Sequence, residues 1–130
     1  MVRIALIAVM LMVTPSWAGD LKKPTSALDG KDITYSYTTG REYNLRFKDG
    51  AVSYRYLSGS KPDKWWGPFP YKAFEIDENT FMLAWFERDY GDYVTLLVNF
   101  DNRLIYGSAL LGGEKVHFHG ATLSDSTAVE

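Results

Sequence analysis

The chain has 130 residues, no cysteine, and 16 acidic residues against 14 lysines and arginines. This mildly negative balance does not favour nucleic acid or an anionic membrane as a partner. Without cysteine the chain can form neither a disulfide nor a thiolate metal site, so its core alone must hold the fold.

The first 18 residues have the pattern of a secretory signal peptide. Arg3 gives a positive start, an apolar run follows from Ile4 to Val13, and Pro15 ends it. Ser16 and Ala18 are small residues at the two positions that a signal peptidase reads, which predicts cleavage after Ala18. We therefore expect a periplasmic or secreted protein with no membrane association after cleavage. An uncleaved anchor is the alternative.

The rest of the chain is long enough for one domain and not for two. Residues 19–30 are polar and are predicted to form a short leader. Residues 31–123 are predicted to form the domain. Residues 124–130 show no apolar periodicity, which predicts a flexible tail.

Alternation of apolar and polar residues dominates the domain and predicts strands rather than helices. The predicted strands are 33–37, 43–47, 52–56, 71–76, 81–87, 94–100, 104–111 and 115–122. Short turns rich in glycine, aspartate and asparagine separate most of them, which is typical of antiparallel hairpins. We predict an all-β, closed antiparallel barrel of about eight strands, because closure removes exposed edges and leaves room for one small ligand.

The segment from Lys64 to Pro70 is too crowded with proline and aromatic residues to predict a regular strand. It could form a lid over the barrel mouth, with Lys64 as a cation beside aromatic walls, since function concentrates in such loops. The alternative is an irregular connection packed on the outside.

Glu87 is the most informative single residue. By alternation it shares the inward face of Phe81, Leu83 and Trp85. A carboxyl group among aromatic rings is desolvated, which raises its pKa and makes it a candidate proton donor near neutral pH. Alternatively, Glu87 lies just past the rim and is hydrated.

Five tyrosines fall on predicted inward faces: Tyr35, Tyr37, Tyr43, Tyr54 and Tyr56. Each buried hydroxyl needs a hydrogen-bond partner, so a core rarely contains so many. Converging hydroxyls could bind a carboxylate or a phenol. Alternatively, the rings pack in the strands and point their tips outward at the barrel ends.

His117 and His119 share one strand face, a spacing that metals accept. Val116 and Phe118 occupy the opposite face and look like the buried set, so we predict that both histidines point outward. We expect no metal site.

Four stretches carry a family resemblance: ITYSYTTGREY (residues 33–43), VSYRYLSG (residues 52–59), Lys64-Trp65 and AWFE (residues 84–87). In order and spacing they resemble the phenolic acid decarboxylases. Residues 71–87 and 100–123 are also similar to the molybdenum cofactor biosynthesis protein F-like domains, which belong to the same calycin, lipocalin-like superfamily. The resemblance implies a lipocalin-like barrel and non-oxidative decarboxylation of 4-hydroxycinnamic acids without a cofactor.

Carried over by position, Tyr35 and Tyr37 match the family's tyrosine pair and Glu87 its essential glutamate. Lys64 stands where the family has a catalytic arginine; lysine keeps the charge but loses the planar fork that suits a carboxylate. The resemblance therefore implies Glu87, Tyr35, Tyr37 and Lys64 as catalytic residues. The predicted ligand-binding residues are Tyr43, Tyr54, Tyr56, Trp65 and Trp85.

Three hypotheses follow for an exported barrel of this kind. It could decarboxylate a small aromatic carboxylic acid, it could bind a small aromatic or amphipathic ligand without catalysis, or it could be an interaction module with a filled core. The sequence leaves the oligomeric state open, with a homodimer among the alternatives.

Overall fold

The computed structural model describes residues 7–12, 17–59 and 61–128 and shows a closed antiparallel barrel. Its eight strands are β1 (Lys31–Tyr37), β2 (Glu42–Lys48), β3 (Ala51–Tyr56), β4 (Trp65–Asp77), β5 (Thr80–Glu87), β6 (Asp92–Asn99), β7 (Leu104–Leu111) and β8 (Lys115–Ala128). Each strand pairs with the next, and β8 returns to β1. The predicted all-β, lipocalin-like barrel is confirmed.

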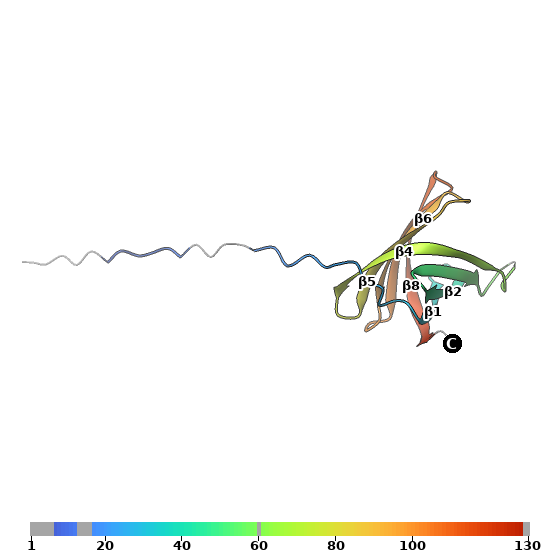
Figure 1. Cartoon of the computed structure of the whole chain (residues 1–130), viewed down its shortest axis with the longest axis horizontal. Coiled ribbons are helices and arrows are strands. Elements are labelled where there is room, and N and C mark those ends of the chain that lie inside the picture. The colour runs from blue at the N-terminus through green and yellow to red at the C-terminus, as the bar shows by residue number, and fades with distance from the viewer. Residues whose placement is uncertain (1–6, 13–16, 60, 129–130) are drawn as a thin grey trace, which may run out of the picture.

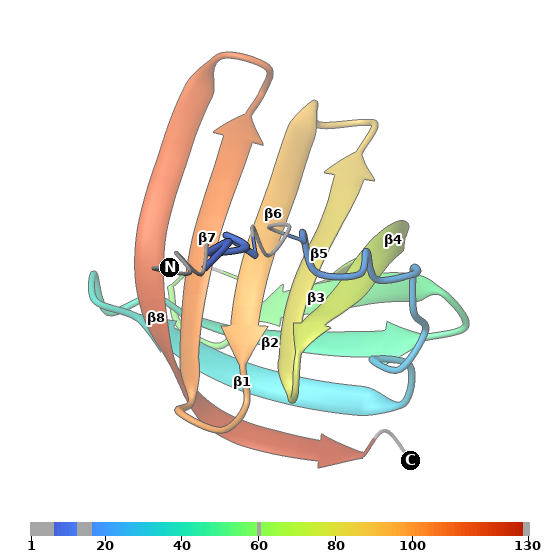
Figure 2. The same ribbon diagram turned by 90° about the vertical axis from the view of Figure 1, so that its left-hand side faces the viewer.

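The barrel is flattened rather than round. Figure 2 shows β5, β6, β7 and β8 side by side on one face, with β1, β2 and β3 crossing behind them. Between these two layers lie the buried members of the alternating pattern, including Ile33, Phe47, Leu83, Leu96 and Ile105. Alternation in the sequence therefore produces the core directly, because every second side chain of each strand enters the same interior.

The segment Trp65–Pro70 is part of a strand, which corrects the prediction of a lid or irregular connection. This first half of β4 pairs only with β3, and the second half, from Tyr71 to Asp77, pairs only with β5. Pro68 and Pro70 therefore stand where one strand edge is free, and a missing N–H costs no ladder hydrogen bond there.

The end of the chain also differs from the predicted flexible tail. Residues 124–128 continue β8 and pair with β1, where Asp125 lies opposite Thr34 and Thr127 opposite Asp32. The Ser124 hydroxyl donates to the Thr34 carbonyl at 3.0 Å. These polar residues carry no apolar signal, but β1 needs a second neighbour to close the barrel. Residues 129–130 lie outside the described part of the chain.

Much of the predicted leader packs against the barrel. The Thr25 N–H donates to the Ala73 carbonyl at 2.9 Å, so residues 24–25 cover an edge of β4 that β3 leaves unpaired. Leu28 then enters the core and is only 1% exposed. Residues 17–23 extend away from the barrel (Figure 1).

The signal-peptide prediction falls partly outside the described residues, which omit Arg3, Pro15 and Ser16. Within the described ranges, no helix is long and apolar enough to cross a membrane.

The burial of Leu28 yields a stability prediction. Replacing Leu28 with alanine should lower the free energy of unfolding by about 2–5 kcal/mol, because a large apolar side chain leaves a packed core. Urea denaturation measures this change. The matched control is Leu21→Ala, since Leu21 is 98% exposed and its loss should matter by less than about 0.5 kcal/mol. Equal effects of the two substitutions would show that residues 24–30 do not stabilise the barrel.

Candidate functional site

A cavity of about 190 Å³ opens at the barrel end that carries the β1–β2 and β7–β8 turns. Its wall contains all five tyrosines predicted to point inward, together with Trp85 and Glu87. Arg41, Asp92 and His117 add polar groups, and four aliphatic side chains complete the lining. The structure thus brings together most of the sequence-predicted site residues.

The tyrosine rings pack against one another through their edges. Tyr37 lies edge-on to both Tyr35 and Tyr43, with ring centroids 5.4 Å apart in each pair. Tyr56 continues the cluster, 5.1 Å from Tyr43 and 5.9 Å from Tyr54. Edge-to-face contacts of this kind fix ring orientation. The cluster is therefore a firm wall whose hydroxyl groups are held in place.

Burial raises the pKa of the Tyr35, Tyr37, Tyr54 and Tyr56 phenols above their ordinary value. These hydroxyls therefore stay protonated at physiological pH. Each can donate one hydrogen bond and accept others, which suits a carboxylate or a phenol oxygen.

The inward orientation predicted for Glu87 is confirmed, since it is 2% exposed. Tyr54 Oη donates to Glu87 Oε2 at 3.0 Å, and Trp85 Nε1 donates to Glu87 Oε1 at 2.9 Å. Burial raises the pKa of the Glu87 carboxyl, the two hydrogen bonds offset only part of that rise, and nearby Asp92 adds to it. The result is an oriented carboxyl that holds its proton more tightly than an exposed glutamate does.

Lys64 and Trp65 do not line this cavity. Lys64 is exposed, and its Nζ lies 3.9 Å from the ring centroid of Trp66. Trp65 lies on the outer surface between the guanidinium groups of Arg46 and Arg55, 4.5 and 5.0 Å from its ring. The cause is register: Trp65 pairs with Arg55, which faces outward, whereas Trp66 pairs with Tyr54, which faces inward.

Arg41 is the cation that lines the cavity, and sequence reasoning missed it. It lies in the turn that joins β1 to β2, where no alternation indicates direction. The available signal was a positive charge in the short segment between Tyr37 and Tyr43. Arg41 replaces Lys64 as the candidate counter-charge.

The prediction that both histidines point outward is wrong. Val116 and Phe118 are 67% and 81% exposed, whereas His117 lines the cavity and His119 packs edge-on against Tyr37. Counting back by twos from buried Ala121 would have placed both imidazoles inside. Apolar character misled the assignment, because the outer face of this strand is itself apolar.

The two imidazoles meet at the mouth of the cavity, with their Nε2 atoms 3.0 Å apart. Partial burial lowers the pKa of His117, and the positive charges that His119, Lys115 and Arg41 can carry lower it further. Across the described residues, no group of three or more histidine, cysteine, aspartate or glutamate side chains is placed to hold a metal ion.

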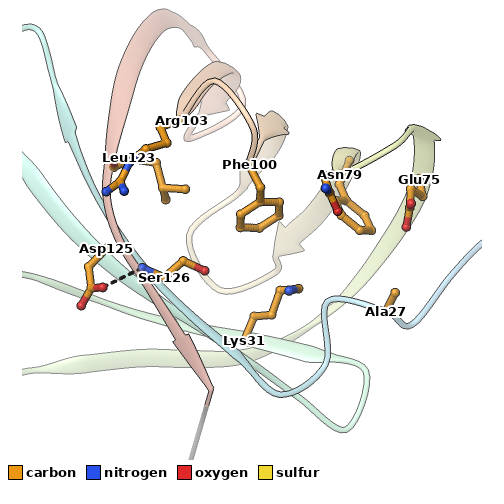
Figure 3. A pocket seen from close by; sticks show the side chains of 10 residues that line it. Ala27, Lys31, Glu75, Asn79, Phe100, Arg103, Leu123, Asp125 and Ser126 are labelled. Atoms are coloured by element: carbon orange, nitrogen blue, oxygen red, sulfur yellow. Dashed lines mark hydrogen bonds between the residues drawn. The ribbon is translucent and has the colours of Figure 1, made fainter.

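A larger hollow of about 550 Å³ lies at the opposite end of the barrel and contains none of the predicted site residues (Figure 3). Lys31 Nζ lies 5.0 Å from the Phe100 ring centroid, and Arg103 is bound to the carbonyl groups of Leu123 and Ser124. Glu75 and Asp125 balance these two cations. The charges of this hollow are balanced, Arg103 is engaged, and the predicted site residues gather in the tyrosine-lined cavity instead, which is therefore the candidate site.

The raised pKa of Glu87 predicts how stability depends on pH. The folded state binds this proton more tightly than the unfolded chain does. The stabilisation is therefore complete below the ordinary carboxyl pKa of 4.5 and is lost as pH rises through the raised value. The glutamine of Glu87→Gln cannot ionise. As pH rises from 4.5 through the raised pKa, the free energy of unfolding of this variant should therefore fall less than that of the wild type. Urea denaturation at a series of pH values measures both. The exposed Glu114→Gln is the control. A difference between wild type and Glu87→Gln that stays constant with pH would contradict the prediction.

The comparisons with known proteins concern the fold and the family. A solved structure described as a putative beta-lactamase from Burkholderia vietnamiensis has a TM-score of 0.65, with 19% identity over 78% of this chain and 95% of its own. At that identity the likeness shows the fold alone. No curated protein matches the chain. The family model described as the MoaF N-terminal domain matches residues 15–109, the greater part of the barrel, which confirms the resemblance to the cofactor-protein-F-like domains. The chain therefore belongs to the MoaF N-terminal domain family.

Proposed function

We propose that this protein is an exported barrel that binds one small aromatic carboxylic acid in its tyrosine-lined cavity. The observation that carries the proposal is the composition of that cavity: five phenols, one indole, one guanidinium, one imidazole and the carboxyl groups of buried Glu87 and of Asp92 around a single space. Such a mixture of rigid aromatic walls and a few placed polar groups is typical of small-molecule sites. The export signal in the first 18 residues supports a periplasmic or secreted setting.

The size of the cavity limits the ligand. At about 190 Å³ it is smaller than the roughly 300–1,000 Å³ of sites for drug-sized molecules. It is slightly larger than a cavity of about 150 Å³ that accepts benzene. A ligand with one aromatic ring and a short acidic side chain fits this range.

The polar groups suggest how such a ligand lies. Arg41 supplies the only cationic side chain that is always charged among the lining residues. Glu87 and Tyr54 form the polar end deeper in the barrel. When the ligand's carboxylate lies near Arg41, the ligand's ring lies among the tyrosines. The substituent on the far side of the ring then points toward Glu87, so the ligand's carboxylate is kept away from that acidic residue.

Decarboxylation is the second candidate, and Glu87 is the observation that favours it. Its raised pKa suits a proton donor, and Tyr35 and Tyr37 line the same cavity. In that reaction Glu87 gives its proton to the alkene carbon next to the carboxylate while the substrate's phenol loses its own proton, which forms a quinone methide. Cleavage of the bond to the carboxylate then releases carbon dioxide, and its electron pair restores the aromatic ring as a phenolate. The phenolate and Glu87 take up protons from solvent, which gives the 4-vinylphenol and regenerates the acid. Binding ranks first because Lys64, which the decarboxylase resemblance places in the catalytic set, does not line the cavity.

The binding proposal predicts which cation matters. Titration of the protein with p-coumarate should quench tryptophan fluorescence, since Trp85 lines the cavity. Arg41→Gln should weaken binding about 10-fold or more, because a charge-assisted hydrogen bond contributes roughly 1.5–3 kcal/mol. Lys64→Gln is the matched control and should leave the affinity nearly unchanged. The absence of binding across a panel of single-ring aromatic acids would overturn the proposal.

The catalytic candidate has its own test. If the protein is a decarboxylase, p-coumarate should lose its cinnamate absorbance in the presence of the protein, and Glu87→Gln should abolish turnover while p-coumarate still binds. If the wild type binds p-coumarate but does not convert it, decarboxylation of this substrate is excluded and ligand binding remains as the function.

A further inference from the structure

The outer surface of β5, β6, β7 and β8 forms a single uncharged face, called here the outer sheet face. The outer sheet face is defined here by twelve outward positions that the strand register aligns in three rows of four, starting at the end with the cavity mouth; a fourth outward row, Thr80, Asn99, Leu104 and Thr122, lies beyond them. None of the twelve positions, all within the described chain, carries a charged residue or a histidine. Figure 2 shows these strands side by side on the near face of the barrel.

Two of the rows are ridges of large side chains. The row nearest the cavity mouth runs Phe86, Tyr93, Leu110, Val116 across the four strands. All four are exposed.

The third row runs Met82, Leu97, Tyr106, Gly120, with large side chains on its first three strands. It is continued on β4 by Phe74, which pairs with Met82. The outer sheet face thus has an apolar ridge along each of two sides.

The middle row is a trough with one projection. Ala84, Thr95 and Ser108 lie in register on β5, β6 and β7 and carry small side chains. Phe118 ends the row on β8 and is 81% exposed, the highest value among the apolar residues of the strands. The outer sheet face therefore carries both a trough of small side chains and a protruding aromatic side chain that such a trough could accept.

The opposite outer surface is different in kind. On β1, β2 and β3 the outward positions include Asp32, Arg46 and Arg55, and Asp32 forms an ion pair with Arg46 at 2.6 Å. Charged outer residues keep a sheet surface soluble and unpaired. The twelve positions of the outer sheet face carry no charge, and the charged residue in register with their middle row is Lys72 on β4, which pairs with Ala84.

The exposed area is sufficient for a stable interface. At about 150–250 Å² for a whole aromatic side chain, Phe86, Tyr93, Tyr106 and Phe118 together expose roughly 350–600 Å². Met82, Leu110 and Val116 add to this. The total approaches the ~800 Å² that each partner contributes to an interface of standard size, and exceeds what a monomer usually exposes in one patch.

We propose that the outer sheet faces of two copies of this chain pack together in a two-fold symmetric dimer. In a two-fold interface the same surface must complement itself. A two-fold axis that lies in the interface plane, parallel to the strands, brings the two faces together and runs the two middle rows antiparallel. Phe118 of each copy then enters the small-residue trough of the other, and the apolar ridges meet at the flanks.

A second copy fits better than a charged partner, because the outer sheet face offers no charge for such a partner to pair with. It also fits sheet-on-sheet packing, in which two apolar β faces lie about 10 Å apart with interdigitating side chains. The cavity mouth stays open, since it lies at the end of the barrel and not on this face.

The test is the mass in solution of the chain from Gly19 onward, measured by light scattering after gel filtration over a range of concentrations. We expect twice the mass of one chain for the wild type. Phe118→Asp removes the knob and buries a charge, and Ser108→Arg fills the trough, so each should give the mass of one chain. Leu21→Asp makes the same kind of change outside the face and should remain a dimer.

Thermal unfolding followed by circular dichroism checks that each variant folds. Phe118→Asp and Ser108→Arg change the two opposite sides of the same proposed contact. If Phe118→Asp does not fold, Ser108→Arg still decides the outcome. A wild type that stays at the mass of one chain at every concentration would overturn the proposal. So would a folded Ser108→Arg variant that remains a dimer. Binding of the monomeric wild type to lipid vesicles would assign the face to a membrane surface instead.

Discussion

The pairing of β8 with β1 is the constraint on which the rest of the structure depends. An open eight-stranded sheet would leave two edges of unpaired N–H and C=O groups, and closure removes both. Closure explains why the polar residues 124–128 are ordered in a strand. It also explains the division of β4, whose halves each pair with a different neighbour, and the role of residues 24–25 in covering the remaining edge.

Closure also gathers a set of phenols around one cavity. Five tyrosines and a glutamate enter the same interior because alternation on β1, β2, β3 and β5 sends them there. The rings hold one another edge-on, and Glu87 receives hydrogen bonds on both of its oxygens. A buried carboxyl is tolerated only when its polar atoms are paired. The same contacts that make Glu87 compatible with the core therefore also fix its orientation in the cavity wall.

The two layers of the barrel carry different surfaces. The layer of β1, β2 and β3 lines the cavity with most of its tyrosines and faces solvent with charged residues, among which Arg46 and Arg55 enclose Trp65. The layer of β5–β8 supplies Trp85, Glu87 and His117 to the cavity and presents the uncharged outer sheet face. Substitutions that test the proposed ligand site and substitutions that test the proposed dimer therefore fall on opposite faces of the same strands.

The sequence by itself determined the fold class, the strands of clear alternation, and the inward orientation of Tyr35, Tyr54 and Glu87, because period-two patterning is a local property of the chain. Only the tertiary structure decided the positions where local pattern and pairing disagree. Trp65–Pro70 became a strand because β3 required a neighbour, and Lys64 fell outside the cavity through the register of that pairing. His117 and His119 turned inward because their apolar neighbours lie on a face that is itself apolar. Arg41 entered the site from a turn, where no periodicity exists to predict direction.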